Sequence, residues 1–162
     1  MKVFTVILLL FTSTLAFSAY ELCLGYYGLF WGVGITYFND GFYISGRLSG
    51  FELSFVNWFF PQLSAGYSFQ TPKLGPLETS VRGGGFLGIT LGVSTWTVGA
   101  ESPLFGLEAF ATFKLPVGFG KIGMLAGTLF PIAGFTSSGA IVFYPGASPV
   151  MFLPQFGITY DF

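Results

Sequence analysis

The 162-residue sequence contains no histidine and only one cysteine, Cys23. Without an imidazole, the Ser–His and Cys–His nucleophile pairs of acyl transfer and proteolysis cannot form. A single thiol excludes an intramolecular disulfide, and one Cys without His provides no typical ligand set for zinc. We therefore expect no enzyme activity, no metal site and no cofactor.

Charged residues are also scarce, because 6 Lys and Arg and 7 Asp and Glu make up only 8% of the chain. A soluble domain usually carries about 25% charged residues, so this composition is unsuited to a surface in water. The near balance of signs also excludes a basic nucleic-acid-binding surface. The sequence is instead 52% hydrophobic and 20% aromatic, with 24 glycines, which indicates lipid surroundings.

The first 18 residues have the pattern of a secretory signal peptide. Lys2 precedes an apolar run from Val3 to Leu15, and the small-residue sequence Ala16-Phe17-Ser18 follows. This run is shorter than the roughly 20 residues that a helix needs to cross a bilayer core. We expect residues 1–18 to be cleaved on export and residues 19–162 to form one domain.

The rest of the chain alternates apolar and polar residues with period two, which is typical of a strand facing lipid on one side. Only helices and closed barrels satisfy every backbone group in hydrocarbon, and period two favours the barrel. A helical bundle is the alternative, because the segment from Ile122 to Tyr144 has no charge. Pro131 and the cluster at 136–139 divide that segment into two strand lengths.

The predicted fold is all-β, an antiparallel transmembrane β-barrel of eight strands, or of ten if a long segment divides. The expected strands cover residues 21–38, 42–55, 62–70, 84–100, 104–115, 119–130, 139–145 and 150–162. The stretch from Thr71 to Gly83 is expected to be the largest exposed loop. If the chain starts on the periplasmic side, this loop and the Asn39-Asp40-Gly41 hairpin would point out of the cell. A β-bulge at Gly50 would bring Glu52 onto the face of Arg47.

Six charged residues are expected to point into the barrel and form a polar network: Arg47, Glu52, Arg82, Glu108, Lys114 and Lys121. Charges in a narrow lumen must pair or be hydrated. We interpret them as internal salt bridges that fix the strand register, with a ligand or ion path as the alternative. Phe110, Leu125, Met151 and Leu153 would fill remaining space, since eight strands enclose an interior just wide enough for side chains.

The signal peptide, the Gly- and aromatic-rich strands and the last seven residues together resemble the small eight-stranded outer-membrane β-barrel proteins of bacteria. In that family the closing strand ends in an aromatic residue preceded by apolar residues at alternate positions. The matching residues here are Phe156, Ile158, Tyr160 and Phe162.

The resemblance implies a bacterial outer-membrane location, membrane lipid as the surroundings, and recognition of the last strand by the barrel-assembly machinery. The expected function is non-enzymatic. The barrel, with a largely side-chain-filled lumen, would support the envelope or anchor a partner protein that the sequence does not identify. The alternative is a narrow passage or binding barrel for small apolar or amphipathic solutes.

Overall fold

The structure is a computed structural model that describes residues 19–27, 30–53, 56–93, 98–100, 103–135, 141–143 and 153–162. The expected signal peptide lies outside these residues. Among the described residues, no helix is long and apolar enough to cross a membrane. The strands are β1 (Ala19–Tyr27), β2 (Phe30–Asn39), β3 (Phe42–Leu53), β4 (Val56–Leu74), β5 (Leu77–Gly88), β6 (Leu91–Val93), β7 (Val98–Ala100), β8 (Leu104–Val117), β9 (Gly120–Phe135), β10 (Ile141–Phe143) and β11 (Leu153–Asp161).

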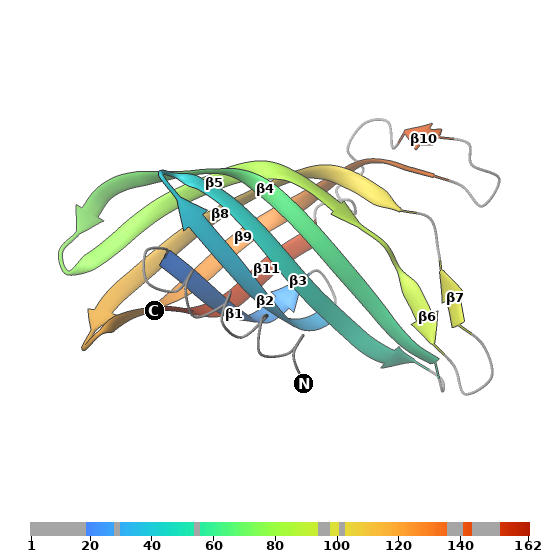
Figure 1. The fold of residues 1–162 in the computed structure, drawn as a ribbon, viewed down its shortest axis with the longest axis horizontal. Coiled ribbons are helices and arrows are strands. Elements are labelled where there is room, and N and C mark those ends of the chain that lie inside the picture. The colour runs from blue at the N-terminus through green and yellow to red at the C-terminus, as the bar shows by residue number, and fades with distance from the viewer. Residues whose placement is uncertain are drawn as a thin grey trace, which may run out of the picture.

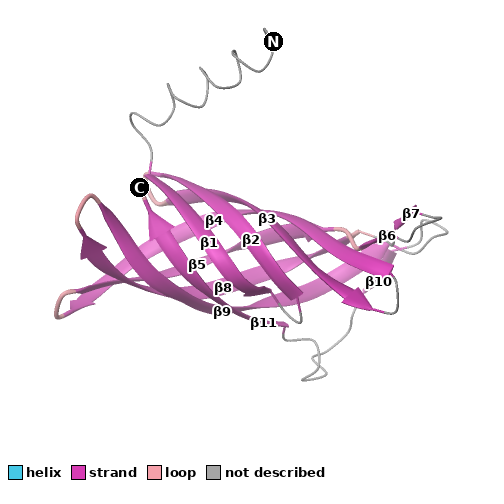
Figure 2. Ribbon diagram, turned by 90° about the horizontal axis from the view of Figure 1, so that it is seen from below, coloured by secondary structure: helices cyan, strands magenta, loops and turns pink. Residues whose placement is uncertain are grey.

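Eight long antiparallel strands close into a barrel, which confirms the expected fold class and strand number (Figures 1 and 2). Their order around the wall is β1-β2-β3-β4-β5-β8-β9-β11, and β11 pairs back with β1 from Glu21↔Asp161 to Tyr27↔Gln155. Closure pairs the edges of the first and last strands. The barrel can therefore lie in lipid without a row of unpaired backbone groups.

The two ends of the barrel differ. One end carries both ends of the described chain and three tight hairpins, at Asp40-Gly41, Gly75-Pro76 and Gly118-Phe119. We call it the terminal end (Figure 1). At the opposite, far end, β6 extends the sheet from β4, β7 pairs with β6, and β10 pairs with β9. Asp40 and Gly41 have φ of 48° and 84°, the left-handed conformation that a tight type I′ hairpin requires.

Several expected strand boundaries are wrong. Residues 21–38 form two strands, since the chain reverses between Tyr27 and Phe30. The expected loop from Thr71 to Gly83 is the paired end of β4 and β5, closed by a turn at Gly75-Pro76. Residues 84–100 are not one strand, and from 139–145 only the short β10 is described. At the first reversal the outward face changes from even-numbered residues, such as Leu22 and Leu24, to odd-numbered ones, such as Trp31 and Val33. Apolar residues at nearly every position from 26 to 31 hide this change in the sequence.

The expected placement of the hairpins is wrong for the same reason. Because residues 21–38 form two strands, the Asp40-Gly41 turn returns to the terminal end, and the β4–β5 hairpin lies there too. The expected bulge at Gly50 is also wrong, because the registers through Trp31↔Gly50 and Gly50↔Phe59 have no shift. Glu52 lies beyond the last β2–β3 pair, Trp31↔Gly50. There, a polar residue is no evidence that its side chain points into the barrel. Its side chain is outside what the structure describes.

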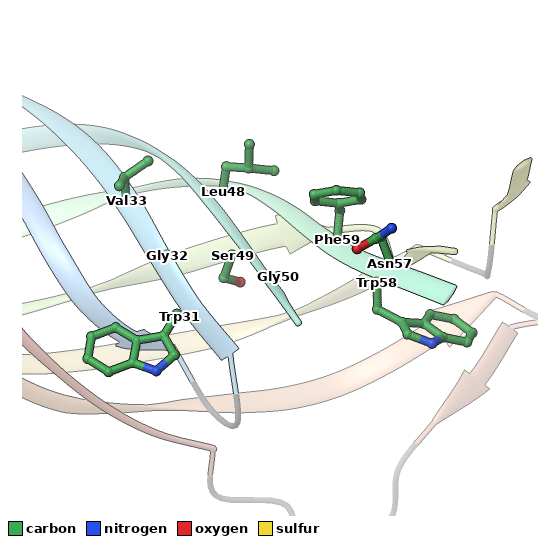
Figure 3. A pocket seen from close by; sticks show the side chains of 9 residues that line it. All are labelled: Trp31, Gly32, Val33, Leu48, Ser49, Gly50, Asn57, Trp58 and Phe59. Atoms are coloured by element: carbon green, nitrogen blue, oxygen red, sulfur yellow. The ribbon is translucent and has the colours of Figure 1, made fainter. Parts of the chain in front are cut away.

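Along most barrel strands, polar or small residues point inward and apolar residues outward, the reverse of a soluble protein. On β9 the inward residues include Leu125 and Leu129. On β11, Phe156 and Ile158 are 59% and 63% exposed, whereas Gln155 and Thr159 are buried. Figure 3 shows the same alternation on β3, where Leu48 and Ser49 leave opposite faces of the strand. Part of the interior is apolar, a cluster formed by Phe60, Phe86, Phe110, Leu125 and Leu129.

Candidate functional site

The first buried charge cluster is centred on Glu108, on β8. Its carboxylate accepts hydrogen bonds from Tyr43 Oη at 2.7 Å, Arg47 Nη1 at 2.7 Å and Gln62 Nε2 at 3.0 Å. The three donors come from β3 and β4, which β5 separates from β8 in the strand order. The Arg47 guanidinium also lies 4.6 Å from the centre of the Phe110 ring. We call these five residues the Glu108 group.

A glycine on β5 makes room for this group. Gly84 pairs with Glu108 across the β5–β8 ladder. A β-carbon at Gly84 would lie 2.6 Å from Tyr43 Oη and would also collide with the Ala65 carbonyl oxygen. Only a residue without a side chain lets the Tyr43 hydroxyl pass this point and reach Glu108.

The second buried charge cluster lies closer to the terminal end. Glu21, on β1, accepts two hydrogen bonds from the Arg82 guanidinium at 2.6 Å each, and Lys114 Nζ lies 2.6 Å from the same carboxylate. Lys114 also donates to both Asp161 oxygens at 2.7 Å. The centre of the Phe38 ring lies 4.5 Å from Arg82 Cζ and 5.5 Å from Lys114 Nζ. We call these five residues the Glu21 group.

The structure places four of the six expected interior charges in these groups. Arg47 and Glu108 form one ion pair, and Arg82 and Lys114 share the second group. Lys121 instead pairs with Glu78 at the rim of the terminal end, where its side chain is 42% exposed. Glu52 has no described side chain.

Sequence reasoning missed Glu21, Tyr43, Gln62 and Glu78 as members of the polar network. For three of them a signal was present. Leu22 and Leu24 point outward, so parity puts Glu21 inside. Ile44 and Leu48 place Tyr43 inside in the same way, and Leu63 and Tyr67 do so for Gln62. Nothing in the sequence indicates which acid meets which base, because the partners lie on strands far apart in the chain.

Glu78 lies in the β4–β5 hairpin, whose exposed polar residues Gln70 and Lys73 place it beyond the apolar belt of the wall. Hydrogen bonds from Lys121 and Lys73 hold the pKa of the Glu78 carboxyl below its usual value. The three side chains therefore form a charged rim at the terminal end.

Two hollows differ in character. A cavity of about 230 Å³ at the terminal end is lined by Arg82, Lys114, Lys121, Glu78 and Asp161, among others. A second hollow of about 370 Å³ lies on β2–β4 among side chains that include Trp31, Leu48 and Phe59 (Figure 3). These three side chains are exposed on the apolar outer surface, so this hollow is suited to lipid and not to a polar solute. Among the described side chains, no three His, Cys, Asp or Glu groups cluster as metal ligands would.

The C-terminal strand closes the barrel next to an aromatic cluster. The Phe162 backbone N–H donates to the Tyr20 carbonyl at 3.2 Å, and the two rings stack with centroids 6.1 Å apart. The ring centroids of Tyr160 and Phe162 are 6.2 Å apart, and those of Tyr37 and Tyr20 are 5.5 Å apart. Phe156 and Ile158 continue the outward face of the strand. Such a cluster is suited to a membrane–water interface.

No family model matches the sequence, and no curated protein matches it. Among solved structures, the chain is similar to a major outer membrane protein of Thermus thermophilus, with 14% identity, a TM-score of 0.56, and coverage of 90% of this chain and 99% of that one. It is also similar to the N-terminal β-barrel domain of Pseudomonas aeruginosa OprF, with 16% identity, a TM-score of 0.50, and coverage of 90% and 96%. The chain thus has the closed eight-stranded antiparallel barrel fold of outer membrane proteins.

Proposed function

We propose that this chain is a non-enzymatic integral protein of the bacterial outer membrane, whose closed and largely filled barrel supports the envelope or anchors a partner protein. The observation that carries the proposal is the occupied interior. Two buried ion-paired groups and an apolar cluster fill a barrel of the narrowest common size.

The outer surface supports the membrane location. Large apolar side chains are exposed on all eight barrel strands, including Leu24 on β1, Val33 on β2, Leu63 on β4, Leu107 on β8 and Ile158 on β11. A soluble protein does not expose a continuous apolar surface of this extent. The aromatic C-terminal strand supports recognition by the barrel-assembly machinery, which remains part of the proposal.

The interior contacts support a structural role. The Glu108 group ties β8 to β3 and β4, and the Glu21 group ties β1 to β5, β8 and β11. Buried ion pairs of this kind are weak sources of net stability, but removing one partner leaves an uncompensated buried charge. We infer that these groups fix the strand register and the cross-section of the barrel. A passage for apolar solutes fits this charged interior less well.

Two measurements test this proposal. Cells expressing the chain are fractionated, and the outer-membrane protein is compared on gels with and without boiling, because a closed barrel migrates differently until it is heated. We expect outer-membrane recovery and a heat-dependent shift. Proteoliposomes are then tested for uptake of small polar and amphipathic dyes, with protein-free liposomes as the control. Uptake above that control would contradict the filled barrel and favour the passage.

A further inference from the structure

The cavity at the terminal end has a lining rich in charge. Arg82, Lys114 and Lys121 are three cations, and Glu78 and Asp161 are two carboxylates, so these side chains carry one more positive than negative charge. Gly41, of the β2–β3 turn, also lines the cavity. The cavity therefore lies at the mouth of the lumen. Phosphate and carboxylate groups are the natural ligands of such a surface.

The cations of this cavity are held in place before any ligand arrives. Arg82 is 2% exposed and Lys114 is 8% exposed, and both are tied to Glu21 below the cavity. Among the described residues, none accepts a hydrogen bond from Arg82 Nε. Thr112, which is 1% exposed, lines the same cavity and shares a hydrogen bond of 2.6 Å with Ser80. Side chains fixed in this way lose little conformational freedom when a ligand binds.

The existing ion pairs favour an anion over a cation. Both Asp161 oxygens are bound by Lys114, and Glu78 is bound by Lys121 and Lys73. A cation would have to displace these ammonium groups. An anion would instead add a partner to Lys121, whose side chain is 42% exposed. The volume of about 230 Å³ is below that of most pockets for drug-sized molecules, so the ligand is a small group.

We propose that this cavity binds a small anionic group, a phosphate or a carboxylate. Lys121 makes the first contact at the rim, and Lys114, Arg82 and the Thr112 hydroxyl lie below it. The group has two possible sources, a free solute on the terminal side of the membrane or the headgroup of a neighbouring phospholipid. The inference goes beyond the proposed function, because a filled barrel requires no ligand at its mouth.

The test is a phosphate titration of the refolded barrel in a non-ionic detergent, which contains no phosphate of its own. Amide shifts of Thr112 and Lys121 are followed by NMR against sodium chloride at the same ionic strength. We expect saturable shifts in the wild type and at least a tenfold weaker affinity in Lys121→Gln. Lys73→Gln is the matched control, because it also removes an ammonium group from Glu78 but Lys73 is not among the cavity-lining residues. It should bind phosphate like the wild type.

Three results would overturn the proposal: no saturable shift in the wild type, unchanged affinity in Lys121→Gln, or equal loss in Lys73→Gln. Lys121→Arg should retain binding, and this guards against a folding defect in the glutamine variant. A repeat in phosphatidylglycerol nanodiscs separates the two sources. If the lipid phosphate occupies the cavity, the signals start at the bound position and added phosphate has no effect. If the ligand is a free solute, the detergent titration is reproduced. Either result supports an anion site.

Discussion

The Tyr43 side chain, on β3, fills the space inside the barrel that a side chain at Gly84, on β5, would need. A β-carbon on the glycine would lie 2.6 Å from the tyrosine hydroxyl. This close approach brings Tyr43 within 2.7 Å of Glu108. An inward glycine on one strand therefore allows a hydrogen bond between two others. The neighbouring Gly83 points outward and has no such neighbour, since its β-carbon would come no closer than 3.9 Å to the nearest atom.

Gly84→Ala is expected to lower the free energy of unfolding by about 1–3 kcal/mol, the usual cost of overpacking an interior. Gly83→Ala should change it by less than about 1 kcal/mol, because the added methyl points outward and makes only an ordinary van der Waals contact. Urea unfolding followed by tryptophan fluorescence measures both. If the two variants are equally stable, the close packing of Gly84 against Tyr43 is contradicted.

Glu108→Leu is expected to cost about 3–5 kcal/mol, because it leaves the Arg47 guanidinium buried without its carboxylate. The double variant Arg47→Leu with Glu108→Leu should cost less than this single one, since no buried charge is left unpaired. The same unfolding experiment is run on both variants and on Arg47→Leu alone. Additive losses from the two single substitutions would show that the charges do not interact.

Ile158→Arg is expected to cost about 2–4 kcal/mol if the residue lies near the bilayer midplane, because its exposed side chain faces lipid. The control is Phe119→Arg at the tip of the β8–β9 turn, where the side chain is 96% exposed beyond the strand. Near the interface an arginine costs about 0–1 kcal/mol. Refolding into lipid vesicles measures both, and equal costs would rule out the assigned apolar belt.

Deletion of Phe162 is expected to leave the refolded barrel nearly as stable but to reduce its level in the outer membrane. Burial of one such side chain contributes at most about 1.5–3 kcal/mol to the free energy of unfolding, and a residue at the end of a strand contributes less. The deletion also removes the hydrogen bond to the Tyr20 carbonyl. Cell fractionation and refolding in detergent are compared. A normal outer-membrane level would show that the assembly machinery does not require this residue.

The fold class was predictable from the sequence because lipid enforces alternation along each strand. On β11, parity alone separates Phe156 and Ile158, outside, from Thr159, inside. The reversal between Tyr27 and Phe30 was not predictable, because glycine recurs too often to mark a turn and apolar residues of both parities surround it, which hides the change of outward face. Where the chain leaves the apolar belt, as at Glu52, the alternation of apolar and polar residues no longer shows whether a side chain points into or out of the barrel.

The charged interior was predictable only in part. Parity identified Arg47, Arg82, Glu108 and Lys114 as inward, but pairing depends on strand order and tilt. Arg82 meets Glu21, which is 61 residues away, and Lys114 meets Asp161, which is 47 residues away. The role of Gly84 was also hidden, since its requirement follows from a tyrosine on a strand that is not its neighbour.

Single-channel recording in planar bilayers tests the filled lumen most directly. The wild-type barrel should give no reproducible conductance steps, because the Glu108 group, the Glu21 group and the apolar cluster occupy its interior. A variant with Phe60, Arg82 and Phe110 all replaced by alanine truncates large side chains from both the charged and the apolar parts. It should give steps, which shows that insertion and detection work. Reproducible steps from the wild type would contradict the account.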